Sequence, residues 1–201
     1  MDVDPMDTIE QLTEERAADA RSARLNAIVA ITVAVLATFM SICKVKDDNI
    51  VQAMQQAQAD RLDQWSFYQA RNIRQEVAMA SVEQLKLARL GRAPAEAAAY
   101  DAAIARYEQL AAEQSRKKDE SKQLATQAQA SYDALNFHDD QFDLSDAALS
   151  LAIALLAVTA LTHQRWLYAA TWLPIGFGVF MGLSGLLGWH FHPDALVRLL
   201  T

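Results

Sequence analysis

The residues best suited to chemistry are aspartates and histidines, which gather in three short segments, 47–48, 138–146 and 190–194. Histidine and carboxylate groups can hold a divalent ion, and rings of carboxylates at a pore mouth concentrate cations. We therefore define a candidate cation rim: Asp47, Asp48, His138, Asp139, Asp140, Asp143, Asp146, His190 and His192. The alternative is that these are ordinary wet residues beside a membrane, where Lys44 and Lys46 neutralise two of the carboxylates.

Motifs for other chemistry are absent from the sequence. There is no GK[ST] phosphate loop, no HExxH, no CxxC and no GxSxG. One cysteine, Cys43, excludes an intramolecular disulfide and a cysteine-based zinc cluster. The net charge of −7 argues against nucleic acid, whose phosphates require a basic face. The expectation is a non-enzymatic protein without a cofactor or a nucleic-acid partner.

Charge is segregated along the chain. Residues 25–43, 147–162 and 166–189 contain no Asp, Glu, Lys or Arg, whereas residues 44–146 contain 13 Lys or Arg and 17 Asp or Glu. A soluble domain gives every helix a wet face, so this segregation is typical of a membrane protein. The first stretch has 19 residues, about 28 Å of helix and close to the thickness of a hydrocarbon core.

These stretches predict transmembrane helices at 25–43, 144–166 and 167–190. The first is followed by CKVKDDN, without a small-residue cleavage site, which favours an uncleaved anchor. Aromatic residues such as Trp166 and Trp189 bracket the third, as expected at membrane interfaces. Pro174 either kinks that helix or begins it after a short turn.

The charged region predicts a long helical hairpin at 44–143. Its only Gly/Pro punctuation is GRAP, residues 91–94, which suits the end of one helix and the start of the next. The two arms have similar lengths, so the chain should return to the same membrane face. The returning arm carries a heptad pattern of coiled-coil type, and we expect it to break at NFHDDQFDLSD before the second span. The heptad positions are Tyr100, Ile104, Tyr107, Ala111, Gln114, Lys118, Ser121, Ala125, Ala128, Tyr132 and Leu135.

The predicted fold class is therefore all-α. It is an integral membrane protein with three transmembrane helices and an extramembrane, antiparallel, coiled-coil-like hairpin. A polar, amphipathic segment at 1–24 precedes the spans and a tail at 191–201 follows them. With this topology, the three segments of the candidate cation rim lie at one membrane face.

Two further sets of residues could make contacts. Small side chains at three- and four-residue spacing mark faces on which lipid-embedded helices approach closely, although alanine is also simply common here. Whether these faces meet within one chain or between chains stays open. They are Ala27, Ala30, Ala34, Ala37 and Ser41 in the first span, and Gly178, Gly182 and Gly185 in the third. Trp65, Phe67 and Tyr68 form a candidate partner patch, unless they pack within the hairpin.

One long block carries a family resemblance: RLNAIVAITVAVLATFMSICKVKDDNIVQAMQQAQADRLDQWSFYQARNIRQEVA, from residue 24 onwards. With the topology, it resembles an uncharacterised family of bacterial membrane proteins, catalogued only as a domain of unknown function, over most of residues 20–192. The resemblance implies a bacterial envelope location. It supplies no activity, no catalytic residue and no cofactor.

The expected function is an oligomeric structural or interaction scaffold in the bacterial inner membrane. Its expected partners are membrane lipids, other copies of the chain and an envelope protein. The alternative is a small oligomeric cation channel or transporter that uses the acidic rim. Lys and Arg near the span ends number four on each side, which fixes no orientation. The acidic approach to the second span favours a periplasmic hairpin.

Overall fold

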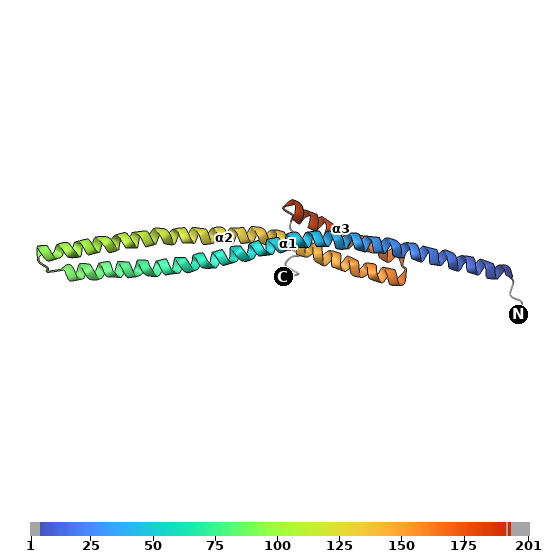
Figure 1. Cartoon of the computed structure of the whole chain (residues 1–201), viewed down its shortest axis with the longest axis horizontal. Helices are drawn as coiled ribbons and strands as arrows, with labels where there is room; N and C mark the ends of the chain where they lie inside the picture. The colour runs from blue at the N-terminus through green and yellow to red at the C-terminus, as the bar shows by residue number, and fades with distance from the viewer. Residues whose placement is uncertain (1–4, 192, 194–201) are drawn as a thin grey trace. The chain divides into compact units, whose positions relative to one another are not determined.

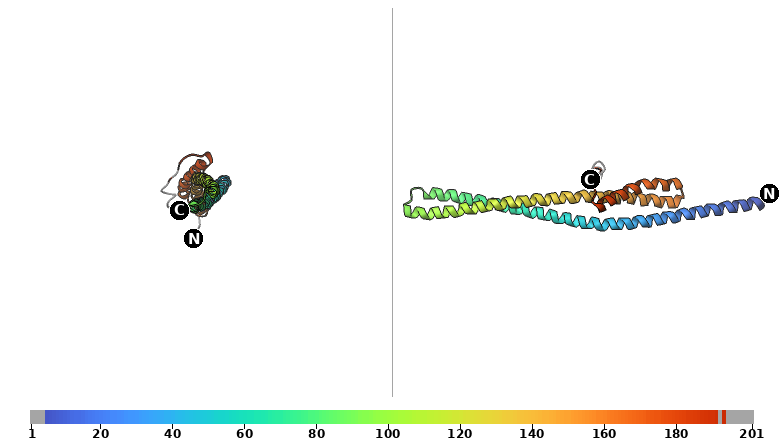
Figure 2. Two further views of the ribbon diagram at one scale, coloured as in Figure 1. Left: turned by 90° about the vertical axis from the view of Figure 1, so that its left-hand side faces the viewer. Right: turned by 90° about the horizontal axis from the view of Figure 1, so that it is seen from above.

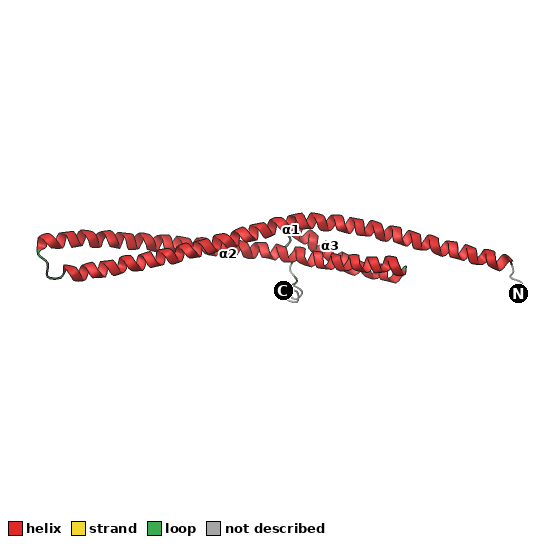
Figure 3. Ribbon diagram, turned by 60° about the horizontal axis from the view of Figure 1, so that its bottom comes forward, coloured by secondary structure: helices red, strands yellow, loops and turns green. Residues whose placement is uncertain are grey.

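The computed structural model describes residues 5–191 and 193 and contains three helices (Figure 1). They are α1 (Pro5–Arg89), α2 (Pro94–Thr162) and α3 (Arg165–Leu187). Figure 3 shows helix throughout the described chain, apart from two connections and the segment after α3. The prediction of an all-α protein is confirmed.

The chain divides into two compact units. Of the described residues, those up to 51 and those from 136 onwards form the span unit, and residues 52–135 form the hairpin unit. Each of the three helices has a stretch that is long and apolar enough to cross a membrane, judged by length and composition. All three helices contribute to the span unit.

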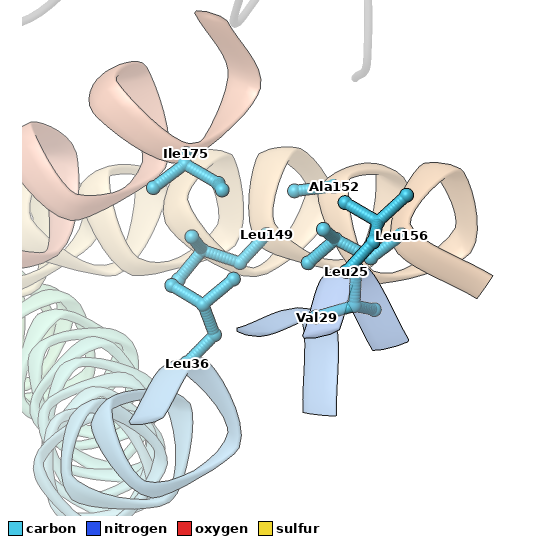
Figure 4. Packing of buried hydrophobic residues seen from close by; sticks show 7 residues of the cluster. All are labelled: Leu25, Val29, Leu36, Leu149, Ala152, Leu156 and Ile175. Atoms are coloured by element: carbon cyan, nitrogen blue, oxygen red, sulfur yellow. The ribbon is translucent and has the colours of Figure 1, made fainter. Parts of the chain in front are cut away.

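The core of the span unit is a cluster of aliphatic side chains from all three helices (Figure 4). Leu149 and Leu156 of α2 are fully buried, and side chains of α1 and α3 pack around them. The cluster consists of Leu25, Val29, Leu36, Leu149, Ala152, Leu156 and Ile175. In lipid, which is as apolar as these side chains, such a cluster would contribute mainly through close packing rather than through the hydrophobic effect.

A two-residue connection, His163 and Gln164, joins α2 to α3. His163 adopts a φ of 53°, the left-handed conformation that often ends a helix, and its N–H donates to the carbonyl of Thr159 at 2.9 Å. Arg165 then begins α3, and Pro174 lies inside that helix. A connection this short makes α2 and α3 antiparallel neighbours.

The predicted break at residues 136–146 is wrong, because α2 continues through it to Thr162. The polar side chains there find partners without ending the helix. Asn136 donates to Asp140 one turn away at 3.3 Å. Ser145 donates its hydroxyl proton to the carbonyl oxygen of Gly178 on α3 at 2.8 Å, so it does not act as a helix cap.

In the hairpin unit, the arms of α1 and α2 lie side by side in Figures 1 and 2. Gly91 has a φ of 78° in the turn between them, a conformation that favours glycine. Close to the turn, Lys86 pairs with Glu108 at 2.8 Å and Arg89 pairs with Asp101 at 2.6 Å. Every position of the heptad pattern is buried or half-buried, so the pattern correctly picked the inner face of the returning arm.

The middle of the hairpin unit has a polar interior. Gln114 is buried, and Lys118 donates to the side-chain oxygen of Asn72 at 3.2 Å. The side chains of Arg71, Gln75 and Gln114 each keep one buried polar atom without a partner among the described residues. Buried polar atoms that lack partners lower stability, so we expect this section to open more readily than the apolar ends.

Candidate functional site

The candidate site is an acidic cluster in the span unit, where Asp47 of α1 lies near Asp139 and Asp143 of α2. Asp47 is only 4% exposed. Its Oδ2 accepts a hydrogen bond from Lys44 Nζ at 2.8 Å, one helical turn earlier. The same ammonium lies 3.4 Å from Asp48 Oδ1. One exposed lysine therefore neutralises part of a cluster whose centre is buried.

A small cavity of about 30 Å³ lies against this cluster. It is lined by Met40, Cys43, Lys44, Asp47, Phe142, Asp143 and Asp146. That volume holds one water molecule or a bare ion and excludes any organic ligand. The polar part of the lining is mostly carboxylate, so the cavity favours a proton or a cation over an anion.

Asp47 and Asp139 are neighbouring carboxyl groups that differ in hydrogen bonding. Oδ1 of Asp47 has no hydrogen-bond partner among the described residues. Burial, followed by hydrogen bonding to Asp47 and the charge of Asp143, raises the pKa of Asp139 from 3.8 to about 7. Two ionised carboxylates can only accept, so the hydrogen bond requires a proton on one of them. A protonated Asp139 can therefore donate a hydrogen bond to Asp47.

The pKa values of Asp143 and Lys44 are also shifted by burial, charge and hydrogen bonding. Burial and the charge of Asp47 raise the pKa of Asp143, with a smaller contribution from Asp140. The hydrogen bond from Lys44 to Asp47 raises the pKa of that lysine. Near neutral pH the cluster can thus hold a proton. No group of three or more His, Cys, Asp or Glu side chains is placed to hold a metal ion within residues 5–191.

The histidines of the candidate rim belong to a different group of contacts. His138 Nδ1 lies 3.1 Å from Gln141 Oε1. The ring centroid of Phe137 lies 5.4 Å from that of His138 and 5.8 Å from that of the exposed His190. Aromatic packing of this kind is typical of interfacial residues. His192 lies outside the described residues.

Gln141 is a functional residue that no sequence pattern indicates. It is fully buried, and its amide nitrogen donates to the backbone carbonyls of Trp189 at 2.8 Å and Phe191 at 2.6 Å. These two bonds attach the chain after α3 to α2. No local signal marks a glutamine for this role, because its partners lie about fifty residues away.

The two sets of small residues have different surroundings. Ala27, Ala30, Ala34, Ala37 and Ser41 are all exposed within the chain. Gly178, Gly182 and Gly185 are buried. A Cβ at Gly178 would lie 2.7 Å from Leu149, one at Gly182 would lie 2.8 Å from Phe39 and Ser145, and one at Gly185 would lie 2.7 Å from Phe142. The glycine face therefore packs within the chain, chiefly on α2, and the alanine face does not.

The candidate partner patch lies in the hairpin unit. Trp65 and Phe67 are exposed, and Tyr68 is half-buried. The rings of Trp65 and Tyr68 meet edge to face, with centroids 5.4 Å apart. Phe67 is the member of this patch most available to a partner.

Comparison with known protein families gives a match over most of the chain. The model of a family described as Domain of unknown function (DUF4337) matches residues 25–188, which includes the three apolar stretches and the hairpin between them. Neither a curated protein nor a solved structure matches the chain.

Proposed function

The chain belongs to the DUF4337 family, and from that premise we propose that it is a non-enzymatic scaffold of the bacterial inner membrane. Its three apolar stretches anchor it and its helical hairpin presents a docking surface. The membrane part of this proposal is supported by three helices of sufficient length and hydropathy. The proposed partners are other copies of the chain.

The observation that carries the proposal is an uncovered apolar face on the outgoing arm. Leu62, Ile73, Val77 and Leu87 are 55%, 63%, 60% and 69% exposed. Their spacings of 11, 4 and 10 residues place them on one side of a helix. Ala78 and Val82 of the same arm are buried. We call these four residues the hairpin apolar face. They form a stripe along one side of the helix, and we propose that this stripe packs against a partner helix.

The alanine face of the first span is a second feature that supports self-association, separate from the hairpin apolar face. Its alanine face is uncovered within the chain, while Leu25, Val29 and Leu36 of the same helix are buried against α2 and α3. A face of small side chains allows two helix backbones to approach closely in lipid. A second copy of α1 satisfies that geometry, because it offers an identical face.

The proposal is tested by photo-crosslinking between two differently tagged copies expressed together. A crosslinker at Ile73 should join the two tags, whereas one at Thr126, exposed on the returning arm, should not. Carbonate washing should leave the chain in the membrane fraction. Equal crosslinking at both positions would refute a specific face, and release by carbonate would refute the membrane anchor.

A cation channel or transporter is the second candidate, and the acidic cluster is the observation that favours it. Against coupled transport, the apolar stretches 25–43, 147–162 and 166–189 contain no charged residue. If an oligomer conducts, exchanging Asp139 and Asp140 for asparagine should lower cation flux in liposomes. Wild-type protein without flux above empty liposomes would exclude conduction.

The proposed orientation places the N-terminus in the cytoplasm and the hairpin in the periplasm. The approach to the second span supports it, because residues 123–146 contain no Lys or Arg. A periplasmic reporter inserted at Gly91, where the turn exposes the chain, should be active. A reporter active only at the N-terminus would reverse this assignment.

A further inference from the structure

Three arginines from two helices line one pocket in the span unit. Arg21 and Arg24 come from α1, and Arg165 is the first residue of α3. Leu25, Ile28 and Tyr168 complete the lining, and the pocket volume is about 360 Å³. The pocket thus combines a basic rim with an apolar and aromatic wall.

Packing below the rim holds the arginines together. Leu25 is buried in the aliphatic core, and Tyr168 packs against that core. The hydroxyl of Tyr168 lies 3.4 Å from the hydroxyl of Thr32, which joins α3 to α1. The two-residue connection after α2 fixes where α3 begins, and so fixes the position of Arg165.

The pocket arginines are not paired with carboxylates among the described residues, although Asp19 precedes Arg21 by two residues on the same helix. Residues 20–46 and 147–193 contain no Asp or Glu. Within the described part of the chain, none of the three arginines forms an ion pair, and all three are exposed. Their donors are therefore available to an anion from outside the protein.

The position of the pocket indicates which anion. Arg24 directly precedes the uncharged stretch 25–43, and Arg165 directly precedes the stretch 166–189. In the proposed membrane protein both therefore lie at head-group depth, with their apolar neighbours toward the acyl chains. Exposed Trp166 and Trp172 follow, as is typical of an interfacial belt. Guanidinium groups bind phosphate oxygens in a bidentate geometry.

We propose that Arg21, Arg24 and Arg165 bind the phosphate of an anionic lipid head group, with the acyl chain lying along Leu25 and Ile28. This inference rests on the proposed membrane embedding. In the orientation given above, the pocket opens to the cytoplasmic leaflet, which carries a negative surface potential. The site would fix the start of α3 against α1 through a lipid.

The test uses the full-length chain in detergent micelles with equal amounts of phosphatidylglycerol and phosphatidylcholine. Native mass spectrometry counts the lipids that the protein retains. We expect phosphatidylglycerol to be retained preferentially. Arg24→Gln and Arg165→Gln, on different helices, should each lower that preference by about fivefold, the factor for one charge at an anionic surface. Arg16→Gln is the matched control, because Arg16 is exposed on the same helix but outside the pocket.

Three results would overturn the lipid site. They are equal retention of the two lipids by the wild type, equal effects of Arg16→Gln and Arg24→Gln, and displacement of phosphatidylglycerol by millimolar inorganic phosphate. The last would assign the pocket to a soluble anion. Carbonate extraction of the wild type separates this inference from the proposed function. A chain that stays in the membrane without lipid preference refutes only the pocket, and a released chain refutes the anchor.

Discussion

Replacing Gly185 by alanine tests the close packing of α3 on α2. The added Cβ would lie 2.7, 2.9 and 3.0 Å from three ring atoms of Phe142. Phe142 is itself buried, so the ring has little room to move. Overpacking of this kind costs about 1–3 kcal/mol of unfolding free energy.

Gly176 provides the matched control on the same helix. A Cβ there meets nothing within 4 Å. Both substitutions gain the same helix propensity, at most about 1 kcal/mol, and this gain cancels in the comparison. We therefore expect Gly185→Ala to be less stable than Gly176→Ala by about 1–3 kcal/mol.

The assay is equilibrium unfolding of the purified chain in mixed micelles by titration with sodium dodecyl sulfate. Far-UV circular dichroism and tryptophan fluorescence follow the transition, and coincident curves establish a two-state process. If Gly185→Ala is as stable as Gly176→Ala, the reasoning is refuted, because α3 would not approach α2 at the glycine face.

Four further predictions follow from single contacts or groups. Ser145→Ala removes the hydrogen bond to the carbonyl of Gly178. It should lower the unfolding free energy in the same titration by about 0.6 kcal/mol, the average for hydrogen bonds between membrane helices, and a loss above about 2 kcal/mol would contradict this. Gln141→Leu leaves the backbone carbonyls of Trp189 and Phe191 without their donor and should lower the free energy of holding this segment on α2 by about 1–3 kcal/mol. Limited proteolysis should then cut the chain after α3 faster than in the wild type, and an unchanged cleavage rate would contradict the prediction. The folded pKa of Asp139 is raised from 3.8 to about 7, so the folded chain holds a proton that the unfolded chain has lost. Its stability should fall as pH rises through that interval, and Asp139→Asn should reduce this fall; an unchanged slope would contradict it. Ala34→Leu should weaken self-association in crosslinking experiments while leaving the unfolding curve unchanged, because Ala34 is exposed within the chain.

Charge segregation and Gly/Pro spacing were sufficient to predict the helices. The all-α class, the three apolar stretches and the turn near Gly91 depend on local composition and periodicity. The heptad pattern also identified the inner face of the returning arm, since burial repeats with the helix period. The continuation of α2 through residues 136–146 was not predictable in this way. Long-range contacts occupy polar side chains that could otherwise have capped a helix, as in the bond from Ser145 to the carbonyl of Gly178.

The candidate site was only partly predictable for a similar reason. The predicted topology places the acidic segments at one membrane face. It does not determine how each helix is rotated about its own axis. That rotation buries Asp47 and leaves Asp48, the next residue, exposed. It also places Nδ1 of His138 beside the side-chain oxygen of Gln141. Knowing which aspartates meet therefore requires the packed structure.

The two-residue connection between α2 and α3 has a consequence for biogenesis. In the proposed membrane orientation this connection stays in the cytoplasm, and a nascent chain would deliver α3 to the translocon directly after α2. His163, Gln164 and Arg165 are the only strongly polar residues there. We expect the two helices to enter the lipid as one preformed pair. Lengthening this connection with glycine and serine should then slow membrane integration, although it would leave every helix sequence intact.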